Sequence, residues 1–222
     1  MSNLLINILL AIIPALGLVF YFHRRDSQKK EPISLIWKIF IIGFFSVFPA
    51  VVIELVLEEF TGMGNTLQAL FARAFIVAAL VEEGIKLSVV RLFVYKRSEF
   101  DEITDGIVYA ITASMGFACF ENILYSTGGL ATVLLRAFTA VPLHAIASGI
   151  MGYYIGYSKF SGTNTMIKGF LIAILIHGLY DFLLFTGTAL GYLVIPLLII
   201  GWIILKRLMK KALLIDRMTG RS

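Results

Sequence analysis

Seven apolar segments, each about twenty residues or longer, dominate this chain and constrain its fold more than any other feature. Of its 222 residues, 59% are hydrophobic and 15% are charged, whereas soluble domains are about half apolar and a quarter charged. An α-helix needs about 20 apolar residues to cross a bilayer. The segments cover residues 3–22, 33–53, 67–95, 103–126, 130–157, 166–186 and 188–205. The sequence therefore predicts an all-α, polytopic bundle of about seven transmembrane helices, forming a single membrane-embedded domain over residues 1–222.

The basic residues near the segment ends predict how this bundle is oriented. They fall at the first, third and fifth connections and in the C-terminal tail, whereas the second connection holds Glu54, Glu58 and Glu59. Because cytoplasmic loops carry the excess of Lys and Arg, we expect the N-terminus outside and the C-terminus in the cytoplasm. The net charge of +5 then indicates contact with an anionic lipid bilayer, and we expect no nucleic-acid partner.

Five ionisable side chains interrupt the apolar segments: Glu82, Glu83, Lys86, Glu121 and Asp181. A charged residue at the bilayer centre costs about 2.5–3.5 kcal/mol on insertion scales, so five facing lipid would cost on the order of 12–18 kcal/mol. These groups must therefore turn toward one another inside the bundle. We expect a polar chamber in its central-to-outer part, of the kind that performs chemistry or moves ions.

The third segment carries the sequence Glu82-Glu83-x-x-Lys86. On a helix, Glu82 and Lys86 are i,i+4 neighbours in the favourable order, so Lys86 can hold one carboxylate ionised. Two adjacent carboxylates in a medium of low dielectric do not both ionise easily, and a carboxylate tuned toward neutrality suits general-base activation of water. A structural ion pair that fixes the helix register is the competing interpretation.

Three later segments add His144, the pair His177 and Asp181, and Glu121. His177 and Asp181 are four residues apart, so the carboxylate can orient the imidazole or both can bind a common ligand. Alone, His144 would be a hydrogen-bonded core residue and Glu121 an interfacial carboxylate. At about 1.5 Å per residue, all of these side chains reach similar depths in the bundle.

The sequence places more negative than positive charge in this chamber. Four carboxylates face Lys86, because we expect Arg73, Arg91 and Arg136 to lie nearer the ends of their segments. Protons shared among the carboxyl and imidazole groups, or a bound cation, would neutralise the excess. His144, His177, Glu121 and Asp181 are candidate ligands for zinc. The H-E-x-x-H pattern of many zinc proteases is absent from the sequence.

In combination, these motifs resemble the PrsW family of membrane-embedded bacterial proteases. The resemblance rests on Glu82-Glu83-x-x-Lys86, Phe117-x-x-x-Glu121-Asn122, His144 and His177-x-x-x-Asp181, in this order on successive segments. That family is more distantly similar to the CAAX prenyl proteases and to abortive-infection membrane proteins. Those distant relatives carry His in place of Glu121 and often Asn in place of Asp181, which leaves both a metal centre and a metal-free glutamate site open.

The resemblance implies a multi-pass protease of the bacterial cell membrane. Its expected substrate is a single-span anti-sigma factor, cut on the extracytoplasmic side as the first step of a stress response. Glu82, Glu83 and His177 become the leading catalytic candidates, with Lys86, Glu121 and Asp181 completing the site. Two other functions compete with this one. A proton-coupled transporter or channel could use the same acids and His as a relay, and an immunity or binding protein could keep the fold without catalysis.

Overall fold

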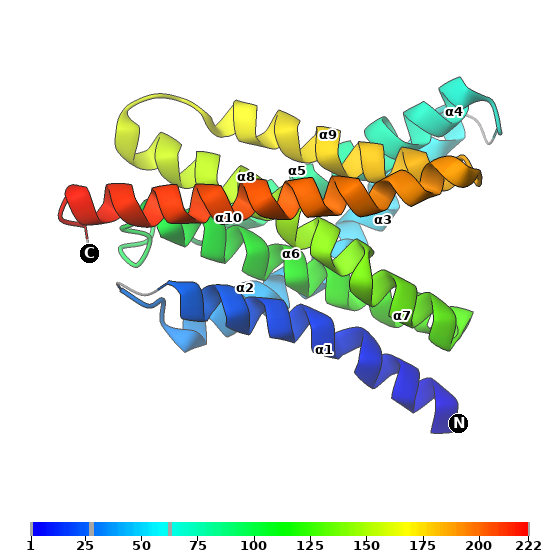
Figure 1. Ribbon diagram of the computed structural model, residues 1–222, viewed down its shortest axis with the longest axis horizontal. Helices are drawn as coiled ribbons and strands as arrows, with labels where there is room; N and C mark the ends of the chain where they lie inside the picture. The colour runs from blue at the N-terminus through cyan, green and yellow to red at the C-terminus, as the bar shows by residue number, and fades with distance from the viewer. Residues whose placement is uncertain (1, 27–28, 62–63, 222) are drawn as a thin grey trace.

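The computed structural model describes residues 2–26, 29–61 and 64–221, and within these ranges it contains helices and no strand (Figure 1). The α-helices are α1 (Ser2–Arg25), α2 (Ile33–Phe45), α3 (Val47–Thr61), α4 (Leu67–Ala72), α5 (Leu80–Phe93), α6 (Ile103–Tyr125), α7 (Leu130–Phe138), α8 (Ala140–Ser161), α9 (Met166–Phe185) and α10 (Val194–Met218). A π-helical segment, η1 (Arg73–Ala79), joins α4 to α5, and the short 3-10 turns η2 (Ser126–Gly128) and η3 (Ala189–Leu193) precede α7 and α10. The prediction of an all-helical membrane bundle is confirmed.

Six of the predicted segments form helical runs that are long and apolar enough to cross a membrane, counted within the described residues. The remaining run, 67–93, carries five charged residues, including the Glu82-Glu83-x-x-Lys86 motif. It still traverses the bundle. Arg73, near its start, lies 3.7 Å from Glu58 at the end of α3, and the loop after it contacts the α1–α2 connection at the opposite end through the Lys29–Asp101 ion pair.

The basic connections gather at one end of the molecule. Besides the Lys29–Asp101 pair, Lys159 donates to the Phe100 carbonyl over 2.5 Å and Arg221 donates to the Phe160 carbonyl over 3.4 Å. In Figure 1 the C-terminus and the α1–α2 connection lie at this end, and the N-terminus and α4 lie at the other. This arrangement agrees with the alternating layout predicted from the loop charges.

Helix α6 is the centre of the bundle. Most of its side chains are buried, and it packs against α1, α2, α5, α8 and α10. Its contact with α8 is close because small residues face each other: a Cβ atom on Gly106 would overlap the backbone of Gly152 and Gly156. The Gly152-x-x-x-Gly156 spacing therefore serves helix packing, as such spacings do in membranes.

Two predicted segments are each divided into two helices, because proline removes a backbone donor and collides with the preceding turn. Pro49 follows the break at Ser46 between α2 and α3, and Pro142 follows the break at Thr139 between α7 and α8. Helix α3 then continues to Thr61, which is longer than the 33–53 segment predicted. As a result, Glu54 and Glu58 lie on a helix and not in a loop.

Candidate active site

The Glu82-Glu83 pair is placed by the unusual start of its helix. Seven π-helical residues, Arg73–Ala79, come directly before α5, and such segments are rare and concentrate at functional sites. The wider π turn packs against α9, where Gly178 faces Phe75: a Cβ atom on Gly178 would overlap the Phe75 ring. This close approach brings the start of α5 beside His177, the residue before Gly178.

Lys86 lies at the centre of the polar side chains. Its Nζ atom is 3.0 Å from Glu82 Oε2, 2.9 Å from Glu83 Oε1 and 2.9 Å from His144 Nδ1. The ammonium group also lies 4.5 Å from the centroid of the Phe117 ring, and the side chain is 1% exposed. A buried lysine needs such partners, because desolvation without them would neutralise it. The structure thus shows Lys86 shared by both glutamates, where the sequence predicted that it would hold one of them.

The two glutamates have different surroundings. Glu83 is 0% exposed, and its carboxylate is held by Lys86, by His177 Nδ1 at 2.9 Å and by the Ser148 hydroxyl at 3.1 Å. Glu82 is bound by Lys86 through Oε2 and lines the main cavity. Glu82 can therefore meet a ligand in the cavity, whereas Glu83 orients the groups around it.

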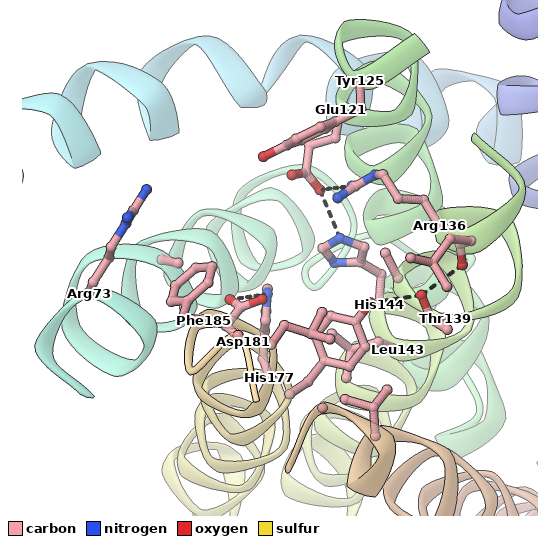
Figure 2. A pocket seen from close by; sticks show the side chains of 18 of the residues that line it. Arg73, Glu121, Tyr125, Arg136, Thr139, Leu143, His144, His177, Asp181 and Phe185 are labelled. Atoms are coloured by element: carbon pink, nitrogen blue, oxygen red, sulfur yellow. Dashed lines mark hydrogen bonds and ion pairs between the residues drawn. The ribbon is translucent and has the colours of Figure 1, made fainter. Parts of the chain in front are cut away.

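His144 and His177 each have a carboxylate partner, as Figure 2 shows. His144 Nε2 lies 2.8 Å from Glu121 Oε2, and His177 Nε2 lies 3.3 Å from Asp181 Oδ2. The two imidazole rings meet edge to face with centroids 5.1 Å apart. The second nitrogen of each ring also has a partner, since His144 Nδ1 lies 2.9 Å from Lys86 Nζ and His177 Nδ1 lies 2.9 Å from Glu83 Oε1. These contacts fix the orientation of both imidazoles, and a metal ion bound by either ring would replace one of them.

Arg136 adds a positive charge to the chamber that the sequence-based charge balance did not include. Its guanidinium lies 3.4 Å from Glu121 Oε2, and its Nε donates to Asn122 Oδ1 over 2.8 Å. The predicted charge balance left Arg136 out because it lies near the end of its segment, but the break at Thr139 allows the short helix α7 to bring this long side chain to Glu121. Two cations, Lys86 and Arg136, therefore face the four carboxylates.

Some of these polar groups, but not Glu83 or Lys86, line a cavity of about 950 Å³, whose volume lies within the range of ligand pockets. Its wall includes Glu54, Glu58 and Arg73 together with the polar residues described above, and apolar side chains such as Leu143 and Phe185. We call the part of the lining at the end of the bundle opposite the basic connections the cavity rim; it includes Glu58, Arg73, Tyr125 and residues of the α9–α10 connection such as Thr188 and Tyr192. The contribution of Glu54 was missed because the second segment was expected to end at residue 53.

A zinc site is chemically compatible with these residues. One ligand atom from each of Glu82, His144 and His177 lies within 4.8 Å of the other two, and two imidazoles with one carboxylate are a common donor set of catalytic zinc. Glu82 joins this set although the sequence analysis proposed it only as a catalytic group. Glu121 and Asp181, proposed as ligands, each contact one of the two imidazoles. Lys86 lies within 3.0 Å of donor atoms of both Glu82 and His144, so a metal ion and the ammonium group would compete for them.

A sequence model described as "PrsW family intramembrane metalloprotease" matches residues 31–206. The chain belongs to the PrsW family. It is 40% identical to a protein named Protease PrsW of Geobacillus kaustophilus, over 82% of this chain and 80% of that protein. It is 34% identical to Protease PrsW of Bacillus subtilis over 93% and 95%, and 39% identical to Protease PrsW of Oceanobacillus iheyensis over 90% and 93%. No solved structure matches the chain.

Membership in the PrsW family confirms the resemblance seen in the sequence. This PrsW family member is a multi-pass membrane protein of bacteria and a protease, hence a hydrolase that acts on a protein in the membrane. A transporter and a non-catalytic binding protein, the two competing functions, are therefore less well supported than a peptidase.

The contact between Gly178 and Phe75 provides a test of how the fold positions the site. We expect Gly178→Ala to reduce cleavage of a membrane-tethered substrate about tenfold to 100-fold, because the added methyl group displaces η1 and with it the Glu83–His177 contact. Gly84→Ala is the matched control, since its Cβ atom would lie 3.7 Å from the Phe170 ring, an ordinary contact. Initial rates on one substrate compare the two variants, and equal rates would contradict the role assigned to the Gly178 contact.

Proposed function

We propose that this protein hydrolyses a peptide bond of a single-span, membrane-tethered protein, and that Glu82 acts on the attacking water. One observation carries the proposal: of the two adjacent glutamates, Glu82 lines the cavity that also holds both imidazoles, and Glu83 is buried among Lys86, His177 and Ser148. A carboxylate that faces a substrate cavity beside fixed hydrogen-bond donors suits general-base catalysis.

The surrounding residues then have defined tasks. The Glu82 carboxylate accepts the proton of the water as its oxygen attacks the substrate carbonyl, and the proton later passes to the leaving amine. Lys86 holds the charges of both glutamates, and Glu83 and Asp181 orient His177. His177 and His144 face the position where the negative charge of the tetrahedral state develops. If zinc were instead held by Glu82, His144 and His177, the ion would polarise the substrate carbonyl and activate the water, and Glu82 would serve as a ligand and not as the base.

We further propose that the substrate is an anti-sigma factor, cut on the extracytoplasmic side during a stress response. The resemblance to the PrsW family supports this choice of substrate. The side of cleavage is supported by the cavity rim, which lies opposite the end where the basic connections gather. Under the positive-inside rule that basic end is cytoplasmic, so the cavity opens to the outside.

Cleavage by the purified protein is the direct test of this function. The full chain in liposomes is mixed with a single-span anti-sigma factor from the same cell, and the products are mapped by mass spectrometry. The proposal expects one cut outside the hydrocarbon region of the substrate, on the side of the cavity rim. If the anti-sigma factor stayed intact while another tethered protein was cut, the proposed substrate would be rejected and the peptidase activity would still be supported.

The orientation is tested separately in cells. Reporter fusions at Lys30, Lys96 and Lys211 should be cytoplasmic, and a fusion at Asn65 should be exported, because the first three lie at the basic end of the bundle and Asn65 at the other. Enzymatic activity of paired cytoplasmic and exported reporters gives the result. A cytoplasmic Asn65 fusion would place the cavity rim in the cytoplasm.

A further inference from the structure

A second cluster of buried carboxylates lies at the basic end of the bundle, far along the chain from the glutamate pair. Asp26 follows the end of α1, Glu31 precedes α2, and Asp105 belongs to the first turn of α6. One carboxylate oxygen from each lies within 4.8 Å of the other two, and all three residues are buried. We call these three residues the acidic cluster. It joins the α1–α2 connection to the start of the central helix.

The cluster has fewer hydrogen-bond donors than its oxygens require. Both carboxylate oxygens of Asp26 and Oδ1 of Asp105 are buried and make no hydrogen bond within the part of the chain that the structure describes. Asp105 Oδ2 accepts from the backbone amides of Asp101 and Glu102, and Glu31 accepts from the Tyr109 hydroxyl. Asp26 is 0% exposed. Burying a charged carboxylate without a partner costs a large amount of free energy. We therefore expect carboxylate oxygens this close together to share a positively charged partner.

Further negative charge surrounds the acidic cluster. Glu102 and Asp216 are also 0% exposed, and Asp216 binds the first amides of α6, Ile103 N at 2.9 Å and Thr104 N at 3.0 Å. Burial, reinforced by the charges of Glu31 and Asp216, raises the pKa of Asp26 to about 7.

Two of the nearby lysines have other partners: Lys29 pairs with Asp101, and Lys159 donates to the Phe100 carbonyl. Lys30 lowers the pKa of Asp26, but less than burial and the neighbouring acids raise it, so these lysines do not neutralise the acidic cluster.

We propose that Asp26, Glu31 and Asp105 bind a hard divalent cation, Mg²⁺ or Ca²⁺. Three carboxylates without nitrogen or sulfur donors favour these ions over zinc. This donor set differs from the site of Glu82, His144 and His177, which is rich in imidazole. The bound ion would hold the α1–α2 connection against the start of α6, so it would stabilise the fold and not take part in peptide hydrolysis.

Thermal unfolding of the purified full chain, treated with EDTA and returned to Mg²⁺ or to Ca²⁺ alone, tests this site. An ion that binds only the folded protein raises its melting temperature, by about 5–10 °C at 100 times the dissociation constant. We expect a saturable rise with at least one of the two ions, and the two arms show which ion binds more tightly. In Asp26→Asn the apparent affinity should fall at least tenfold.

Without the ion, we expect Asp26→Asn to be at least as stable as the wild-type protein. In EDTA, Asp26→Asn should melt at or above the wild-type temperature, because it removes an unpartnered buried charge. Asp101→Asn is the matched control: it removes the same charge from the neighbouring connection, where Asp101 pairs with Lys29, and it should keep the ion response. The proposal would be overturned if neither ion changed the melting temperature of the wild-type protein, or if Asp26→Asn responded as the wild type does. The acidic cluster would then be neutralised by protons shared among its carboxyl groups.

Discussion

Replacing Glu82 with glutamine is expected to lower the rate of substrate cleavage about 10²- to 10⁴-fold while the protein inserts and accumulates normally. Glutamine keeps the volume of the side chain and its hydrogen bond to Lys86 but cannot accept the proton of the attacking water. Because Glu82 lines the cavity, the loss should appear in kcat more than in KM. Initial rates of cleavage of a fluorescent tethered peptide in liposomes, taken over a range of substrate concentrations, give both parameters.

Glu83→Gln should also abolish cleavage, but with a different signature. Its carboxylate is 0% exposed and shared by Lys86, His177 and Ser148. Breaking such a buried network costs on the order of 3–5 kcal/mol of stability, so this variant should melt at a lower temperature than Glu82→Gln. Glu58→Gln is the control at the cavity rim, where the carboxylate lies 3.7 Å from Arg73. If Glu82→Gln cut at the wild-type rate, the general-base assignment would fail and the glutamates would form a structural ion pair.

The sequence predicted the bundle and most of the site because the bilayer imposes strong constraints. Apolar segments of about twenty residues have few alternatives to spanning helices, and charges inside them must face one another. The structure accordingly places Glu82, Glu83, Lys86, His144 and His177 in direct contact with one another. Periodicity and depth were sufficient for this part of the prediction.

Other features depend on local backbone geometry that hydropathy does not encode. Arg136 reaches Glu121 because the helix breaks at Thr139, and Glu54 reaches the cavity because α3 continues beyond residue 53. Pro142 was visible in the sequence and marks the first of these breaks, but it does not give the direction in which α7 leaves. The π-helical segment before Glu82 has no sequence signal that we recognise. The difference between Glu82 and Glu83 follows from this backbone path, so it could be assigned only in three dimensions.

The metal content of the purified protein is expected to show whether a zinc ion or only protein side chains polarise the substrate carbonyl. We expect about one zinc ion per purified chain, lost from His144→Ala and from His177→Ala, because these imidazoles with Glu82 form the compact donor set. Strong chelators should then stop cleavage, and added zinc should restore it. Elemental analysis and cleavage rates on the same samples give the result, and the Gly84→Ala protein serves as a control with both imidazoles intact.

Lys86→Met sharpens this test, because the Lys86 ammonium lies 3.0 Å from Glu82 Oε2 and 2.9 Å from His144 Nδ1. Removing a cation that competes for two of the three donors should make the zinc harder to strip with a chelator, even if Glu83 is left poorly paired and cleavage falls. Full activity in metal-free wild-type protein would give the opposite assignment. Lys86 and Arg136 would then supply the positive charge of the chamber, and the enzyme would be a glutamate protease in which the two imidazoles serve only as hydrogen-bond donors and acceptors.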